Sequence, residues 1–162
     1  MALIDFPQLA ETVSGLSFAS NRLLVVAGGP GSGKSLIIQR IATELGWPIM
    51  NIGKDLSERL LSLTRRQRRL KAEEIMGDLL DTTGHREFCL DNTEILFDPA
   101  LALNPVNLFL SLSRNRVVIA TWNGIFENGS LVYAYPEHPE RFNQLVSGFP
   151  VVSLMDDKLH LF

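Results

Sequence analysis

The sequence contains a single cysteine, Cys89, so no disulfide can form within the chain. One cysteine suits a reducing compartment. The three histidines, His85, His138 and His160, lack the spacing of a metal site. No apolar run approaches the length of a membrane span, and the first residues lack a basic region followed by an apolar stretch. We therefore expect neither a signal peptide nor a membrane contact, and a cytoplasmic location.

A strong excess of either charge is also missing. The net charge is −3 over 162 residues, which argues against a surface dominated by nucleic-acid binding. The length is sufficient for one domain with a core and too small for two ordinary domains. We therefore expect a single domain over residues 1–162. Within it, residues 1–20 are expected to supply a packing helix and residues 124–135 a β-hairpin insertion.

Glycine is concentrated in one stretch, and that stretch is the strongest signal in the sequence. Residues 28–35 read GGPGSGKS, which fits the pattern G-x-x-x-x-G-K-[ST] of a phosphate-binding P-loop. Average residue usage gives a chance match in a chain this long a probability on the order of 1 in 200. Residues 22–27 predict a buried strand before the loop, and residues 36–45 predict a helix after it. This context turns the motif into a credible site.

The residue types of the loop match the chemistry of a nucleoside triphosphate. Glycines let the loop curl so that backbone N–H groups face a phosphate, and the helix N-terminus adds partial positive charge. Lys34 can reach the β- and γ-phosphates, and Ser35 offers a hydroxyl ligand to Mg²⁺. The residues expected to bind the nucleotide are Gly28, Gly29, Pro30, Gly31, Ser32, Gly33, Lys34, Ser35 and Leu36.

A second signal is the short apolar run of residues 88–91, which ends in Asp91. A carboxylate at the end of a strand can orient water on a Mg²⁺ ion held by Ser35, so Asp91 and Ser35 are the expected metal ligands. The next residue is Asn92, whose amide can orient water but cannot accept its proton. Hydrolysis also needs a group that accepts the proton of the attacking water. Glu94 could be that base if the strand ends early. Cys89 is expected to be a small buried residue of this strand.

Residues 116–121 predict another buried strand, and polar residues follow at its end. Asn123 is our choice for a side chain that reaches the phosphates, and Thr121 is the alternative. The predicted catalytic residues are therefore Lys34, Asp91, Asn92, Glu94 and Asn123.

Two further strands are predicted at residues 48–52 and 150–154, which makes five buried strands alternating with helices. This pattern predicts an α/β fold, a three-layer sandwich with a mainly parallel five-stranded sheet and no C-terminal helical lid. Residues 55–80 are expected to be helical, residues 98–112 to form a helix in two pieces, and residues 135–142 to be a loop that leads into a short helix.

The helical region carries an arginine cluster, Arg65, Arg66, Arg68 and Arg69. One interpretation is a solvated face in which Glu73 and Glu74 pair with the basic residues at helical spacing. The alternatives are a contact with DNA or a partner protein, or an arginine delivered to the nucleotide of a neighbouring subunit.

The P-loop, the Asp91-Asn92 strand end and the Asn123 strand end together resemble the additional-strand, AAA+-like P-loop ATPases. The small size, the missing lid and the YPEHP loop at residues 135–139 resemble the BrxF family, small P-loop proteins of type 3 BREX phage-defence systems. These resemblances imply an ATP- and Mg²⁺-dependent ATPase that forms homo-oligomers and acts with other defence-system proteins.

Three functions remain open at this point. The first is a slow ATPase that serves as a nucleotide switch within an assembly. The second is a small nucleotide kinase, because GGPGSGK is similar to the adenylate kinase loop, although Ser35 departs from that family's pattern. The third is a non-hydrolysing, nucleotide-binding scaffold, which Asn92 favours. No Asn/Thr-Lys-x-Asp motif of guanine-reading proteins is present, so adenine is the default expectation.

Overall fold

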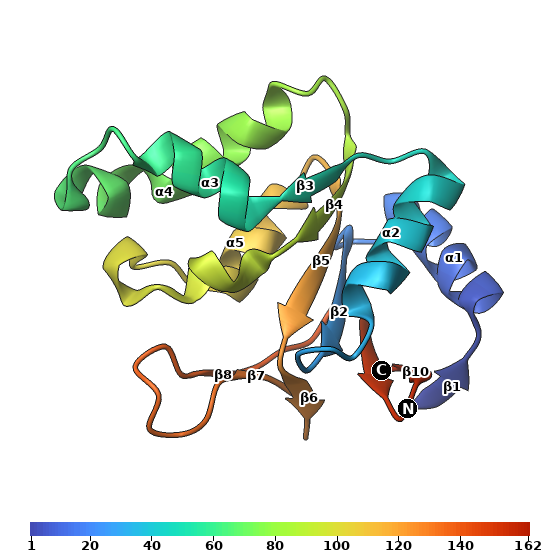
Figure 1. Cartoon of the computed structure of the whole chain (residues 1–162). Helices are drawn as coiled ribbons and strands as arrows, with labels where there is room; N and C mark the ends of the chain where they lie inside the picture. Colours follow the sequence, from blue (N-terminus) through green and yellow to red (C-terminus); the bar gives the residue numbers. More distant parts are fainter.

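The main sheet of the fold contains five parallel strands, arranged in an order that differs from their order in the chain. The computed structural model describes residues 1–162 without a gap. The sheet contains seven strands in the order β1-β10-β9-β2-β5-β4-β3 (Figure 1). From β9 to β3 neighbouring strands pair in parallel, whereas β10 pairs antiparallel with both β9 and β1.

The strands of this sheet are β1 (Ala2–Ile4), β2 (Leu23–Gly28), β3 (Ile49–Asn51), β4 (Glu87–Asp91), β5 (Val117–Asn123), β9 (Val151–Met155) and β10 (Lys158–Leu161). The α-helices are α1 (Phe6–Ser14), α2 (Lys34–Leu45), α3 (Ile52–Leu60), α4 (Arg65–Asp81) and α5 (Pro105–Leu112). Short 3₁₀ helices are η1 (Gly15–Phe18), η2 (Thr93–Phe97) and η3 (Pro99–Leu101). None of the helices combines the length and the apolar composition that a bilayer span requires.

Helices cover both faces of the sheet, which makes the predicted three layers. Every residue of β2 is buried, as expected for a central parallel strand. Its side chains alternate between two cores: Leu23 and Val25 pack with α3, α4 and α5, whereas Leu24 and Val26 pack with α1 and α2. Figure 1 shows the two groups of helices on opposite sides of the strands.

The α/β class, the mainly parallel sheet and the parallel pairing of the fifth strand, β9, with β2 agree with the sequence prediction. The strand count of five was wrong, because β10 and β1 extend the sheet beyond β9. Both strands are short, and β10 returns through a tight turn in which Asp156 and Asp157 have positive φ angles of 51° and 58°. This turn lacks the Asn-Gly or Asp-Gly pair that marks such hairpins in a sequence. After α5 the chain contains no further helix.

The predicted helical region 55–80 is not one helix but two. Helix α3 begins directly after β3, where the Asn51 side chain accepts a hydrogen bond from the Lys54 N–H. It ends at Leu60, and α4 begins with a capping box in which Thr64 and Gln67 exchange side-chain-to-backbone hydrogen bonds. Reciprocal capping of this kind satisfies two N–H groups at a helix start, so it favours a new helix at Arg65. The two helical pieces predicted in residues 98–112 are present as η3 and α5, and Pro105 begins the second.

A second, three-stranded sheet lies beside the main one and has the order β6-β7-β8. Strands β6 (Ile125–Glu127) and β7 (Ser130–Tyr133) form an antiparallel hairpin through Asn128 and Gly129, which both have positive φ. The short helix predicted after residues 135–142 is absent, because the chain continues as β8 (Phe142–Leu145), which pairs with β7. The Phe142 ring packs edge-on against Phe97 and Trp122, and this aromatic cluster fixes the small sheet against η2.

Candidate functional site

The carboxyl ends of β2, β4 and β5 meet at one edge of the sheet, and the glycine-rich loop lies there. The loop connects the end of β2 at Gly28 to the start of α2 at Lys34. Gly31 and Gly33 have φ angles of 73° and 93°, a conformation that costs little only for glycine. At Gly28 an added Cβ would lie 2.3 Å from the Ser32 Oγ atom. Backbone geometry therefore requires glycine at positions 31 and 33, whereas at position 28 an added Cβ would displace the Ser32 hydroxyl.

The backbone N–H groups of residues 31 and 33–36 donate no hydrogen bond within the protein. By contrast, the Ser32 N–H donates to the Gly29 carbonyl and the Ile37 N–H to the Gly33 carbonyl. Unpaired N–H groups at a helix N-terminus, together with the helix dipole, attract anions. The loop thus offers several donors that a phosphate oxygen could satisfy. Leu36 contributes only its N–H, because its side chain is 71 % exposed.

The Lys34 ammonium group is buried and lies over the loop. Its Nζ atom donates to the Gly29 carbonyl at 3.2 Å and to the Asn123 Oδ1 atom at 3.0 Å. Burial lowers the Lys34 pKa from its ordinary value, and the charges of Glu94 and Asp91 partly oppose this effect. A buried cation without a carboxylate within ion-pair distance is well suited to receive an anionic ligand.

The Asp91 carboxylate accepts two hydroxyl hydrogen bonds and is itself buried. The Ser35 Oγ atom donates to its Oδ1 atom at 3.2 Å, and the Thr121 Oγ1 atom donates to the same oxygen at 3.0 Å. The Thr93 hydroxyl in turn donates to the Thr121 carbonyl at 2.7 Å, which fixes the start of η2 against β5. Ser35 and Asp91, the two residues predicted as metal ligands, are therefore in direct contact.

The sequence left Thr121 and Asn123 as alternatives for one position, but both side chains face the site. Residues two apart on a strand point to the same side, so the end of β5 presents both at once. Asn123 contacts Lys34, whereas Thr121 contacts Asp91.

Asn92 has left-handed backbone angles, with φ of 52° and ψ of 55°. Asparagine tolerates this conformation better than most residues, and the Asn92 carbonyl accepts a hydrogen bond from the Gly53 N–H at 2.9 Å. Its side chain makes no hydrogen bond within the protein. Glu94 is the acidic residue whose charge acts most strongly on Lys34. Because β4 ends at Asp91, Glu94 lies beyond the strand, in η2.

Sequence reasoning missed two residues near the site. Thr93 contacts β5 as described, and Tyr133 of the small sheet stacks on Phe97 with ring centroids 3.8 Å apart. Burial raises the Tyr133 pKa, with further contributions from the charges of Glu140 and Glu94. No motif marks either residue, because each depends on contacts between segments that are distant in the chain. Cys89 is buried in β4 as predicted, and burial raises its thiol pKa to about 12.

The residues present fit a magnesium–nucleotide complex better than a metal ion alone. No group of three or more His, Cys, Asp or Glu side chains could hold a metal. Mg²⁺ commonly takes one or two protein oxygens and completes its shell with water and substrate phosphate, and Ser35 and Asp91 supply two oxygens beside the phosphate-binding loop. None of the four cavities in the molecule is lined by a residue of the loop.

No family model matches the chain, and no curated protein matches it. Among solved structures, PCH-2 of C. elegans is similar, with 19 % sequence identity and a TM-score of 0.45. The similar region covers 72 % of this chain and 36 % of the PCH-2 chain. The chain thus corresponds to about a third of the length of PCH-2. A likeness this distant carries no inference about function, and nothing in these comparisons supports the resemblance to BrxF.

Proposed function

We propose that this chain binds ATP with Mg²⁺ and hydrolyses it slowly. The observation that carries the proposal is the meeting of three features at one edge of the sheet: unpaired N–H groups of the loop, the buried Lys34 ammonium and the Ser35–Asp91 pair. Together they match the charge and the oxygen-rich surface of a magnesium triphosphate.

In this proposal each side chain has one task. Lys34 places its charge beside the β- and γ-phosphates, and Asn123 orients the Lys34 ammonium through the 3.0 Å hydrogen bond. Ser35 and Asp91 hold Mg²⁺, while Thr121 orients the Asp91 carboxylate. When bound, Mg²⁺ neutralises charge that develops on the phosphate oxygens.

Hydrolysis requires a group that positions water and accepts its proton. The Asn92 amide could orient water but cannot accept a proton, whereas the Glu94 carboxylate can do both. Glu94 follows the strand end by three residues and belongs to a 3₁₀ helix, so it is less directly positioned than a residue adjacent to Asp91. We therefore propose a slow turnover, which suits a nucleotide-dependent switch.

A role within a homo-oligomer and with other proteins of a phage-defence system is a finer proposal. It rests only on the resemblance to the AAA+-like and BrxF families. The preference for adenine likewise rests on the lack of a guanine-reading motif.

The second candidate is a scaffold that binds nucleotide without hydrolysis. Asn92 favours it, because the residue that follows Asp91 carries an amide that cannot accept a proton from water. Phosphate release from ATP with Mg²⁺, measured over a wide range of protein concentration, separates the two. We expect slow release by the wild-type protein, loss of release with Glu94→Gln while ATP still binds, and loss of both with Lys34→Ala.

The control variant is Lys54→Ala, which removes an exposed lysine from α3 and should leave binding and release unchanged. ATP binding without release at any concentration would favour the scaffold. Equal ATP binding by Lys34→Ala and wild type would refute the site itself.

A further inference from the structure

Two cavities adjoin where the C-terminal end of α3, the N-terminal end of α4 and η3 meet. The first has a volume of about 530 Å³ and an apolar lining that includes Leu60, Leu61 and Ile95. The second has a volume of about 490 Å³ and is lined by Arg65, Arg66, Arg69, Pro99 and Ala100. Arg65 and Ala100 line both cavities, so the two lie side by side, and we call them together the arginine groove.

The arginines of the groove are not neutralised by the protein. The single ion pair of the molecule joins Arg116 to Asp81, so Arg65, Arg66 and Arg69 have no carboxylate within 4.0 Å. The predicted pairing with Glu73 and Glu74 does not form. Arg68 differs from the others, because its Nε atom donates to the Leu60 and Leu63 carbonyls and closes the α3–α4 corner.

This arrangement is locally unfavourable. Arg65 and Arg69 lie four residues apart on one helix, and Arg66 and Arg69 lie three apart, so their like charges repel. The cluster also occupies the N-terminal end of α4, where the helix dipole disfavours cations, and the first turn contains no acidic residue. An anionic partner would relieve all of these repulsions at once.

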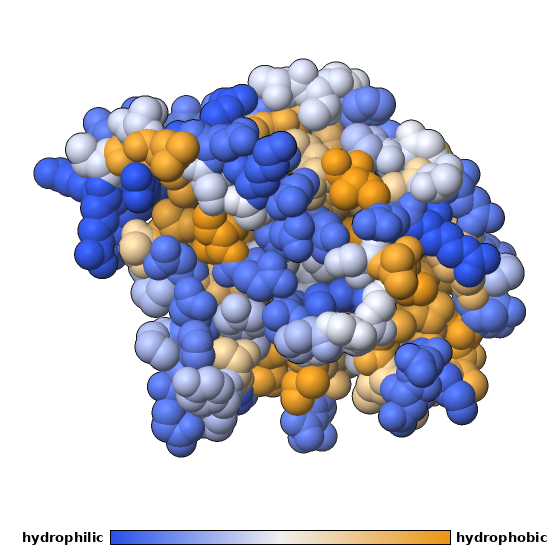
Figure 2. Space-filling model, viewed as in Figure 1, coloured by the Kyte–Doolittle hydropathy of each residue, from blue (hydrophilic) through white to orange (hydrophobic).

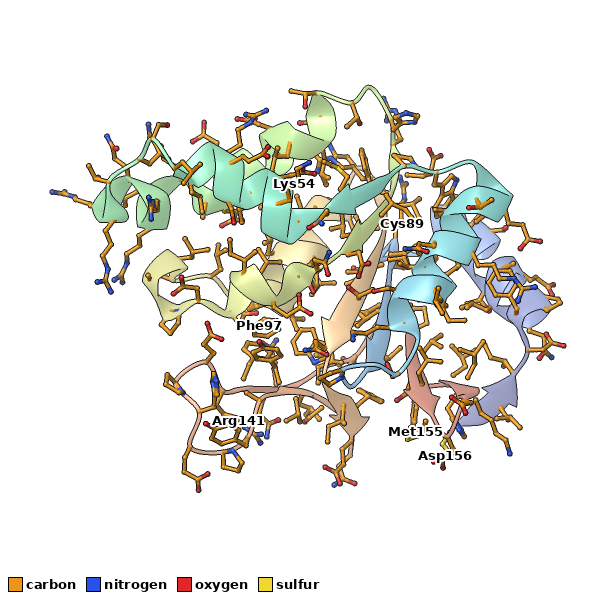
Figure 3. The ribbon with its side chains drawn as sticks, viewed as in Figure 1. Lys54, Cys89, Phe97, Arg141, Met155 and Asp156 are labelled. Atoms are coloured by element: carbon orange, nitrogen blue, oxygen red, sulfur yellow. The ribbon has the colours of Figure 1, made fainter.

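We infer that the arginine groove binds an acidic peptide segment of a partner protein. One apolar side chain of the segment would fill the cavity beside Leu61 and Ile95, and its carboxylates would pair with Arg65, Arg66 and Arg69. Figure 2 shows the matching surface, an orange area bordered by dark blue on the side where α3 and α4 lie. In Figure 3, nitrogen-tipped side chains extend outward from the same end of α4.

The observations favour a peptide over DNA. A phosphate backbone carries no apolar group to occupy the Leu60–Ile95 cavity, and the Asp98 carboxylate in that cavity would repel phosphate. A peptide can donate its N–H groups to Asp98. The basic side chains are also confined to one turn of helix on a chain of net charge −3, whereas duplex binding requires an extended basic surface.

Fluorescence anisotropy with the full chain tests the inference. The probe is a fluorescein-labelled peptide in which glutamates flank a central Leu-Leu pair, and the comparison peptide has Ala-Ala at the centre. We expect the Leu-Leu peptide to bind roughly fivefold or more tightly than the Ala-Ala peptide, because the apolar pair enters the cavity.

The chain offers matched control variants. Arg69→Glu should weaken binding roughly tenfold, whereas Lys71→Glu, on the same helix but outside the groove, should change it less than about twofold. Leu61→Gln should remove the preference for Leu-Leu, whereas Leu70→Gln should not. Leu61 and Leu70 are 76 % and 70 % exposed, so neither substitution should unfold the protein.

Several outcomes would overturn the inference. The inference fails if neither peptide binds at low salt, if both peptides bind equally, or if Arg69→Glu and Lys71→Glu have equal effects. A labelled DNA duplex that binds more tightly than the peptide and loses affinity with Arg69→Glu would identify DNA as the ligand instead. Self-association in sedimentation that Arg69→Glu abolishes would identify a second copy of the chain as the occupant.

Discussion

Replacing Asp91 by asparagine should separate the stability of the fold from its affinity for magnesium nucleotide. The substitution keeps the shape of the side chain and removes its charge. In the free protein the carboxylate gains from two hydroxyl hydrogen bonds and from the nearby Lys34 charge, but its burial is costly. Making the acceptor neutral weakens each hydrogen bond by about 1 kcal/mol, and removing the buried charge returns a similar amount. We expect the free energy of unfolding to change by less than about 2 kcal/mol.

The effect on Mg²⁺-dependent binding should be larger. A unit charge and a divalent cation about 4 Å apart attract by about 2 kcal/mol in water and by about 8 kcal/mol at an effective dielectric constant of about 20. The lower figure alone corresponds to roughly a thirtyfold change in affinity. Asp91→Asn should therefore weaken ATP binding in the presence of Mg²⁺ by at least roughly thirtyfold, whereas binding measured with a chelator present should change little.

Isothermal titration calorimetry with ATP, with Mg²⁺ or with chelator, measures the affinities, and urea denaturation measures stability. Glu87→Gln is the matched control, because it removes one carboxylate from the opposite end of the same strand, β4. Equal Mg²⁺-dependent affinity in Asp91→Asn and wild type would refute the assignment of Asp91 to the metal. A loss of equal size with and without Mg²⁺ would instead indicate a damaged loop.

Three further substitutions test other parts of the structure. Glu94→Gln removes a charge that raises the Lys34 pKa, so Lys34 should lose its proton at a lower pH than in wild type. As pH rises toward the ordinary lysine value of 10.5, the ATP affinity of the variant should therefore begin to fall first, and calorimetry across that range checks the direction. Gly28→Ala should weaken ATP binding roughly tenfold because its Cβ meets Ser32 Oγ, and adding Ser32→Gly should restore it in the same assay. Trp122→Phe should lower the free energy of unfolding by about 2–3 kcal/mol in urea, because it leaves a gap in the core and breaks the indole hydrogen bond to a β7 carbonyl.

The parts of the fold that sequence reasoning predicted well are those in which local signals agree with the tertiary structure. Residues 23–28 are apolar and lead directly into glycines, so strand, loop and helix could each be assigned from neighbouring residues. The first helix was equally accessible, because its start is defined by a local capping box between Asp5 and Gln8. In these segments the hydrogen bonds that define the element lie within a few residues of one another.

Two of the parts that were wrong depend on partners far away in the chain. β8 contains two polar residues in four, and it forms a strand because it pairs with β7 and because Phe142 packs in the aromatic cluster. β1 consists of three residues and pairs only with β10, at the other end of the chain. The break between α3 and α4 had a local signal in the Thr64–Gln67 capping box, but the leucines on either side of it continue an apolar pattern and obscured the break.

Position 92 illustrates how a local backbone conformation changes a functional interpretation. As a residue type, Asn92 suggests that the position next to Asp91 supplies no catalytic base, because an amide cannot accept a proton. In the fold it occupies a left-handed position whose carbonyl anchors the start of α3, a structural demand that asparagine meets and glutamate does not. The left-handed residue also redirects the chain into η2, and Glu94 of that helix exerts the largest opposing charge effect on the Lys34 pKa. Asn92 therefore supports a base displaced to Glu94 as much as a missing base, and the proposed hydrolysis depends on Glu94.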